Sequence, residues 1–185
     1  DIGIHAFNST ITGGRTELAG SATTGWQDAI QIFSELNTEA GARLSNCSLN
    51  LKGRLTTYGN YYGIDALNTD MSFDFLKAYA NQKDALKLDG CSLKYNNNLY
   101  RGYLDSLDYT TNAFKEYFQH QVTLLNNGGA INAKNSTIGP VYTSAMPDIY
   151  ESFFISGTHG VYKSADATKN AKPNVILDGS HLDAI

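Results

Sequence analysis

Apolar and polar residues alternate along several parts of this chain, and this period of two residues limits its fold more than any other feature. The alternation runs from Cys47 to Lys52 and again from Phe118 to Leu124. Successive side chains of a β-strand point to opposite faces, so a strand with one buried face shows this pattern. We therefore expect a mainly β protein.

Clusters of Asn and Gly separate these segments. Gly13-Gly14, Asn96–Asn98 and Asn126–Gly129 are typical of the turns that join antiparallel strands. We therefore expect an antiparallel β-barrel or sandwich. In that fold, Asn96–Asn98 closes a hairpin between residues 88–95 and 99–109.

Two segments have apolar residues at helical spacing. The first lies near residues 24–37 and the second near residues 70–82, where Asn68-Thr69-Asp70 provides a cap. The sequence thus predicts one or two short helices inside a core domain of residues 1–129. Residues 130–185 have a looser pattern and are predicted to form a C-terminal extension or insertion.

A parallel β-solenoid is the alternative fold. A loose pattern of apolar and small residues begins at Ile4, Ala42, Leu86, Ile131 and Val175, with starts 38, 44, 45 and 44 residues apart. A weaker match at Ile64 divides one interval into two steps of 22 residues. A solenoid produces such spacing because each coil presents the same strand to the next. The segments between the matches do not resemble one another, so the barrel or sandwich stays the first expectation.

Composition excludes two classes of partner. Only 17% of the residues are charged, and the net charge is −4 with a pI near 5.5. Sequence-specific nucleic-acid binding needs clustered Lys and Arg, which this chain lacks. No apolar run approaches the ~20 residues that span a bilayer, so we expect no membrane insertion.

The polar residues offer weak candidates for chemistry. Asp178, Ser180, His181 and Asp183 lie within six residues, but neighbours on one strand point to opposite faces and do not build a catalytic triad. Asp105 and Asp108 could form a carboxylate pair, yet nothing else marks a sugar-cleaving cleft. The four histidines stand far apart: His5, His120, His159 and His181. We therefore expect no catalytic, cofactor-binding or metal-binding residues, and no enzyme.

The segment from Asn68 to Leu125 resembles the β-barrel proteins of phage tail tubes and baseplates. The similarity is carried by Phe73–Tyr79, Leu88-Asp89-Gly90, Tyr100–Leu107 and Tyr117–Leu124, and by Gly25-Trp26 upstream. It covers about a third of the chain, and residues 130–185 have no counterpart in it. The resemblance implies a ring-forming structural protein with no catalytic residues.

The first functional expectation is therefore a non-catalytic virion protein that assembles with copies of itself and with other structural subunits through sheet edges and loops. Its twelve tyrosines suit subunit interfaces or strand packing equally. The alternative is a secreted or surface β-solenoid adhesin that binds carbohydrate or a host surface. Cys47 and Cys91 form either a disulfide or two buried thiols, and chance explains the Asn-X-Ser/Thr sequons at Asn8, Asn46 and Asn135. Phe153 and Phe154 pack either in the core or on a neighbouring subunit.

Overall fold

The chain folds into fifteen strands within the residues that the structure describes. The structure is a computed structural model, and it describes residues 1–13, 30–96, 122–141, 153–156 and 175–183. The strands are β1 Ile2–Phe7, β2 Thr10–Gly13, β3 Ile30–Glu35, β4 Ala40–Ser45, β5 Ser48–Tyr58, β6 Tyr62–Leu67, β7 Asp70–Tyr79, β8 Asp84–Asp89, β9 Ser92–Asn96, β10 Val122–Leu125, β11 Gly129–Lys134, β12 Thr137–Val141, β13 Phe153–Ser156, β14 Val175–Asp178 and β15 His181–Leu182.

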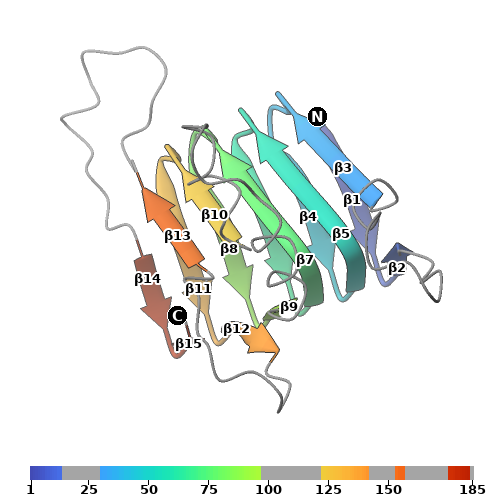
Figure 1. Cartoon of the computed structure of the whole chain (residues 1–185), viewed down its shortest axis with the longest axis vertical. Coiled ribbons are helices and arrows are strands. Elements are labelled where there is room, and N and C mark those ends of the chain that lie inside the picture. Colours follow the sequence, from blue (N-terminus) through green and yellow to red (C-terminus); the bar gives the residue numbers. More distant parts are fainter. Residues whose placement is uncertain (14–29, 97–121, 142–152, 157–174, 184–185) are drawn as a thin grey trace, which may run out of the picture.

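The strands form two sheets in which every pairing is parallel. Sheet A has the order β1-β4-β6-β8-β11-β14, and sheet B contains β2, β3, β5, β7, β9, β10, β12, β13 and β15. The chain passes from one sheet to the other and back, so it winds through successive coils stacked side by side (Figure 1). The expectation of an antiparallel barrel or sandwich is therefore wrong, because the strands stack in parallel and the sheets do not close. Parallel stacking is the arrangement on which the alternative solenoid reading depended.

The two predicted helices are also wrong for the described residues. Residues 70–79 form β7, and residues 30–35 of the first predicted helix form β3. The predicted hairpin at Asn96–Asn98 would need an unpaired edge of β9 for its second strand, and residues 97–109 of that hairpin lie outside the described residues. The strand β9 already pairs in parallel with β7 on one side and β12 on the other.

A complete coil spans 22 residues, as the equivalent positions Asn46, Asn68 and Gly90 show. The other coils carry additional residues, and three of these additions interrupt sheet B within one residue of the same register position. They fall after Gly13, Asn96 and Val141, and the chain rejoins the sheet at β3, β10 and β13. In β5 the register shifts at the corresponding place, between Leu51 and Arg54.

The core lies between the two sheets and runs along the stack. Sheet A supplies rows of buried side chains such as Ala42, Ile64, Leu86 and Ile131, which are register partners from coil to coil. Sheet B supplies equivalent rows that include Leu49, Met71, Leu93 and Ile138. Each row buries similar apolar side chains on one another, which accounts for much of the stability of such a stack.

One corner of the coil is closed by buried asparagines. Asn37, Asn60, Asn81 and Asn127 occupy equivalent positions where sheet B returns to sheet A, and the last three are at most 1% exposed. Each Nδ2 donates to the Oδ1 of the next asparagine, at 2.8, 3.1 and 2.8 Å. The backbone N–H of the same residue donates to that oxygen as well, at 2.9 to 3.0 Å. This buried asparagine ladder satisfies polar groups that would otherwise be unpaired inside the protein.

Candidate functional site

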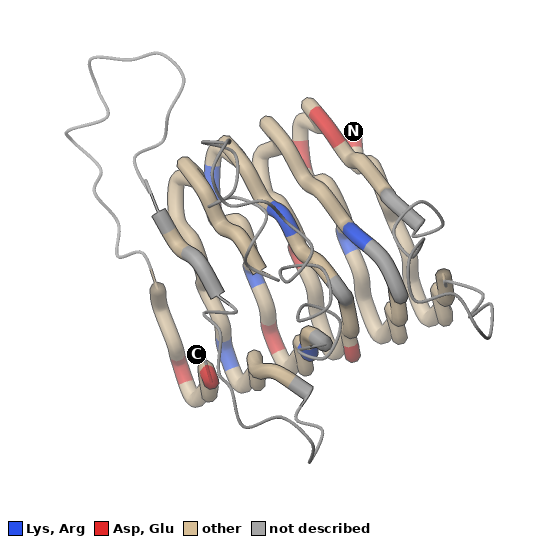
Figure 2. The backbone as a smooth tube through the Cα atoms, in the orientation of Figure 1, with Lys and Arg blue, Asp and Glu red and all other residues tan. Residues whose placement is uncertain are grey.

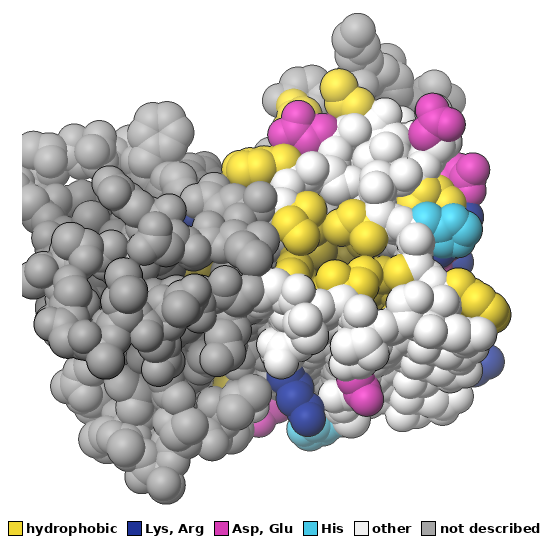
Figure 3. Space-filling view, turned by 90° about the vertical axis from the view of Figure 1, so that its right-hand side faces the viewer, with side chains coloured by type: hydrophobic (Ala, Val, Ile, Leu, Met, Phe, Trp, Pro, Cys, Tyr) yellow, Lys and Arg dark blue, Asp and Glu magenta, His cyan; other side chains and the backbone are white. Residues whose placement is uncertain are grey.

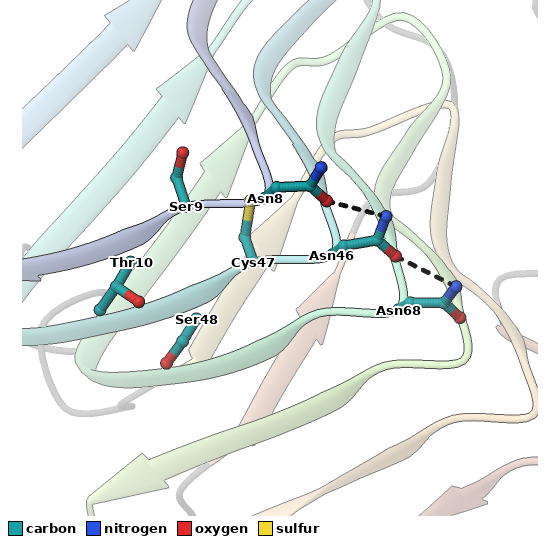
Figure 4. A pocket seen from close by; sticks show the side chains of 7 residues that line it. All are labelled: Asn8, Ser9, Thr10, Asn46, Cys47, Ser48 and Asn68. Carbon is teal, nitrogen blue, oxygen red and sulfur yellow. Dashed lines mark hydrogen bonds between the residues drawn. The ribbon is translucent and has the colours of Figure 1, made fainter.

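The opposite corner, where sheet A passes to sheet B, carries a second row of asparagines that faces outward. Asn8, Asn46 and Asn68 have φ values of 48°, 52° and 46°, in the left-handed region that asparagine and glycine tolerate best. Asn46 Nδ2 donates to Asn8 Oδ1 at 3.2 Å, and Asn68 Nδ2 donates to Asn46 Oδ1 at 3.3 Å (Figure 4). Gly90, Asn135 and Gly179 occupy the equivalent position in the later coils, also with positive φ.

The residue after this left-handed position is small in every coil. The six residues are Ser9, Cys47, Thr69, Cys91, Ser136 and Ser180. Each side chain donates to the carbonyl oxygen two residues earlier, at 2.7 to 3.3 Å. In three of the coils the hydroxyl also accepts the backbone N–H of the preceding coil, as Ser136 Oγ does from Cys91 at 3.0 Å. The corner is thus built from side chains that replace missing backbone partners.

A shallow groove of about 470 Å³ lies along this corner at the first three coils. We call it the corner groove, and its lining residues are Asn8, Ser9, Thr10, Asn46, Cys47, Ser48 and Asn68. All of them except Cys47 are exposed. The Cys47 thiol is buried and donates to the Ser45 carbonyl oxygen at 3.1 Å. The exposed groups are therefore amides and hydroxyls, which donate and accept hydrogen bonds without carrying charge.

This geometry also explains the three sequons. Asn8, Asn46 and Asn135 all occupy the left-handed corner position, and a hydroxyl or thiol residue follows each of them. The third residue of each sequon is Thr10, Ser48 or Thr137, at the start of the next strand. The sequon spacing therefore repeats because the corner repeats.

The outer face of sheet A carries a chain of ion pairs. Asp65 accepts from Arg43 Nε at 3.4 Å and from Lys87 Nζ at 3.1 Å, while Arg43 Nη1 also binds Glu39 at 2.6 Å. These residues come from successive coils, so the sign of the charge alternates along the stack (Figure 2). Beside this row lies a second groove, of about 340 Å³, whose charged lining residues are Asp65, Asp89, Lys87 and Lys134. Its two acids and two bases balance, so it offers no net charge for an ionic ligand.

Lys77 is a buried ionisable side chain that the sequence did not predict. It is 2% exposed, and its Nζ donates to Thr123 Oγ1 of the neighbouring strand at 2.7 Å. Burial, and secondarily the nearby Arg54 charge, lower the pKa of Lys77 to about 7. Its register partners Thr56 and Thr123 are buried too. A lysine inside a β-strand normally indicates a solvent-facing position, so no sequence signal marked this one.

Among the described residues, those that the sequence suggested for chemistry do not form a catalytic or metal-binding cluster. The Ser180 hydroxyl donates to the Asp178 carbonyl oxygen at 3.1 Å, as the corner residue of each described coil does in its own coil, and it also accepts the Ser136 N–H at 2.9 Å. His5 and His181 lie in β1 and β15, at opposite ends of the stack. Asp105, Asp108, His120 and His159 lie outside the described residues. Among the residues that the structure describes, no His, Cys, Asp and Glu cluster could hold a metal ion.

The tyrosines and cysteines divide between core and surface. Tyr95 is fully buried and its hydroxyl donates to the Asp183 carbonyl oxygen at 3.0 Å, whereas Tyr58 is 40% exposed. The rings of Tyr61 and Tyr62 meet edge to face with centroids 5.0 Å apart. Cys47 and Cys91 are buried free thiols, so the disulfide is not formed.

The backbone of residues 153–156 forms β13, which pairs with β10 and so belongs to sheet B. Whether the Phe153 and Phe154 side chains dock on a neighbour stays a prediction. None of the described residues forms a helix with the length and hydrophobicity of a membrane span. Comparison with protein-family models, with curated proteins and with solved structures gave no match.

Proposed function

We propose that this protein binds an extended neutral polysaccharide through the corner groove, as a non-catalytic solenoid outside the cell or on a surface. The observation that carries the proposal is the row Asn8–Asn46–Asn68, which repeats the same exposed amide once per coil. A polymer of similar units lying along the stack would meet the same hydrogen-bonding groups at each step.

The chemistry of the groove favours sugar hydroxyls over charged ligands. A sugar hydroxyl both donates and accepts, and the amide of asparagine offers both functions. The hydroxyls of Ser9, Thr10 and Ser48 flank the amide row and add further groups of the same kind (Figure 4). Among the described residues, no Lys, Arg, Asp or Glu lines the groove.

The rigidity of the corner supports binding as well. The amides are held by each other, and the backbone beneath them is fixed by hydrogen bonds from Asn8 N–H to Ser45 O at 3.0 Å and from Asn46 N–H to Leu67 O at 2.9 Å. Groups that are already ordered lose little conformational entropy when a ligand binds.

The test measures binding of neutral gluco-, galacto- and manno-oligosaccharides to the full chain by calorimetry. The variant is the double change Asn8→Gly and Asn46→Gly, because glycine keeps the left-handed backbone and removes only the amides. Losing two hydrogen bonds of about 1 kcal/mol each should weaken binding at least about tenfold. The matched control is Asn135→Gly, which makes the same change at the same corner position outside the groove.

Control and double variant should both keep the melting temperature of the parent within a few degrees. Unchanged affinity in the double variant, or absence of binding to every neutral sugar in the panel, contradicts the proposal.

A self-assembling structural protein, which includes a virion protein, is the second candidate function. The tail-tube resemblance implies a barrel, and the fold is a parallel stack, so we do not rest this candidate on the resemblance. It is favoured instead by the parallel pairing of the strands, because β1 and β14 each pair with a single strand among the described residues.

A further inference from the structure

The exposed amide row of the corner groove keeps unused hydrogen-bonding capacity. Each bond in the row takes one of the two hydrogens on an Nδ2 and one of the two lone pairs on an Oδ1. Asn46, in the middle of the row, therefore keeps one N–H and one lone pair, which no other described residue uses. Since Asn46 is exposed, both are available to a ligand.

The row lies on the rim of the coil and outside the core. Figure 3 faces the first coil: hydrophobic side chains gather in the middle of its described part, with side chains of other kinds and backbone around them. Asn8, Asn46 and Asn68 come from three successive coils, whose strands pair in parallel and in register. Neighbouring strands lie ~4.8 Å apart, so the same donor and acceptor recur at this step along a straight line.

This step restricts the linkage of a sugar chain that follows the row. In a six-membered sugar whose two glycosidic bonds are both equatorial, the bonds point in nearly opposite directions. The chain is then a straight ribbon with hydroxyls along its edges, and its advance per sugar is close to the spacing of neighbouring strands. An axial bond bends the chain at every sugar, so the hydroxyls of a chain with axial bonds leave the line of the amides.

Gly90 interrupts the amide row at the next coil. It occupies the same left-handed corner position, with a φ of 64°, and has no side chain to offer a ligand. A Cβ at this position would lie 2.5 Å from Asn68 Oδ1, so the glycine leaves space at the end of the row. Asn135 follows one coil later and Gly179 one coil after that. The corner groove therefore presents three consecutive amides before the gap.

We propose that the ligand of the corner groove is an equatorially linked ribbon of neutral six-membered sugars, which lies along the stack with one sugar over each coil. This inference rests on the proposed sugar binding and specifies the linkage and the register of the ligand. Three sugars occupy the row from Asn8 to Asn68, and a fourth lies over Gly90 without an amide partner.

The first test compares linkages. Calorimetry measures the binding of β-1,4-linked glucose and mannose trisaccharides and of the α-1,4-linked glucose trisaccharide to the full chain. The better of the two β-linked ligands should bind at least about tenfold more tightly than the α-linked one, because only a straight chain reaches all three amides. Equal or tighter binding of the α-linked ligand overturns this inference and leaves sugar binding intact. Absence of binding to every neutral sugar overturns both.

The second test adds one amide to the row with Gly90→Asn. Asparagine tolerates the left-handed region, and the nearest neighbour of the new Cβ is the far end of the Asn68 side chain, which can turn. In the parent, the β-linked tetrasaccharide should bind within about twofold of the trisaccharide. In the variant the fourth sugar gains a partner, so the tetrasaccharide should bind about fivefold more tightly than the trisaccharide.

Gly179→Asn is the matched control. It makes the same change at the same corner position, with a φ of 58° and a new Cβ 2.8 Å from Asn135 Oδ1, but two coils beyond Gly90. It should leave the ratio of the two affinities at the value of the parent. Circular dichroism and the melting temperature check that both variants fold. A Gly90→Asn variant with the parental ratio overturns the proposed register.

Asn68→Gly keeps the test decisive if Gly90→Asn does not fold. It shortens the row to Asn8 and Asn46, so the third sugar should add less than about twofold to the affinity of the disaccharide. In the parent the third sugar should add about fivefold. A third sugar that contributes equally in the parent and in Asn68→Gly contradicts one sugar per coil.

Discussion

Asn60 gives Asn81 two hydrogen bonds across one coil: its backbone N–H and its Nδ2 both reach Asn81 Oδ1, at 3.0 and 3.1 Å. The second Nδ2 hydrogen reaches the Ser34 carbonyl at 2.9 Å. Asn60 and Asn81 are fully buried or nearly so, at 0% and 1% exposure. A single side-chain oxygen thus satisfies two buried donors of the neighbouring coil.

Asn81→Ala should therefore destabilise the protein more than any exposed asparagine change. It leaves both donors of Asn60 without this acceptor and removes the donor to Asn127, and buried unsatisfied groups cost about 1–3 kcal/mol each. We expect a loss of about 3 kcal/mol or more in the free energy of unfolding, measured in urea.

The control is Asn68→Gly at the exposed corner. It keeps the left-handed backbone and loses a single hydrogen bond of 3.3 Å, so the loss should stay below about 1.5 kcal/mol. Equal losses for the two variants would show that the buried ladder has no special weight.

Lys77 should make the stability depend on pH. Its pKa is lowered from 10.5 to about 7 in the folded protein, so between these values the unfolded chain binds more protons at this site. The free energy of unfolding should therefore rise from about pH 7 toward about pH 10.5, and the full penalty for burying the charge applies below pH 7.

Lys77→Met removes this dependence. The variant should gain stability relative to the parent at about pH 6 and lose part of that advantage at about pH 9. Urea unfolding of both proteins at the two pH values gives the comparison. Thr123→Val serves as the control, because it removes the hydrogen bond from Lys77 Nζ and leaves the amine in place. A stability difference between Lys77→Met and the parent that is equal at both pH values contradicts the assigned pKa.

Alternation in the sequence predicted strands correctly where one face of the strand is solvated, as from Ser48 to Leu51 in β5. It failed in β7, where Phe73, Phe75, Leu76 and Ala78 are all buried. A parallel strand covered on both faces loses its alternation, and the remaining apolar spacing resembles that of a helix. The helix prediction for residues 70–82 has this cause.

The asparagine turns were misread for a related reason. Local sequence indicates that Asn126-Asn127-Gly128 changes the chain direction, and the positive φ of 55° at Asn126 agrees. The partners of such a turn are set by distant residues, however: Asn127 Oδ1 accepts from Asn81, 46 residues earlier. The 22-residue spacing between Ala42 and Ile64 is the sequence feature that indicates which distant residues pair. The corner groove results from this coil-to-coil pairing, and no local motif predicts it.

The alternating charges on sheet A should contribute a small, salt-sensitive stabilisation. Asp65 lies between Arg43 and Lys87 and is 19% exposed. Asp65→Asn removes both ion pairs and leaves the two cations one coil either side of the site. We expect a loss of about 1 kcal/mol at low salt, which shrinks as salt screens the charges.

Asp70→Asn provides the control for this measurement. Asp70 is exposed and makes no ion pair with the other described residues. Its replacement should leave the free energy of unfolding within about 0.5 kcal/mol of the parent at either salt concentration. If the effect of Asp65→Asn is independent of salt, its cause is packing rather than charge.

The two cysteines should behave as substitutes for serine in the corner and never as a disulfide. Thr69 occupies the coil between Cys47 and Cys91, so the cysteines are two steps of about 4.8 Å apart, beyond the ~7 Å that a disulfide spans between Cα atoms. The Cys91 thiol donates to the Asp89 carbonyl oxygen at 3.3 Å, and burial raises the pKa of this thiol.

The free energy of unfolding of Cys91→Ser should stay within about 1 kcal/mol of the parent, because serine keeps the donor, whereas Cys91→Ala should lose about 1–3 kcal/mol. Thiol titration of the unfolded chain without reductant should find both cysteines free, and a melting temperature that falls when reductant is added would contradict this assignment.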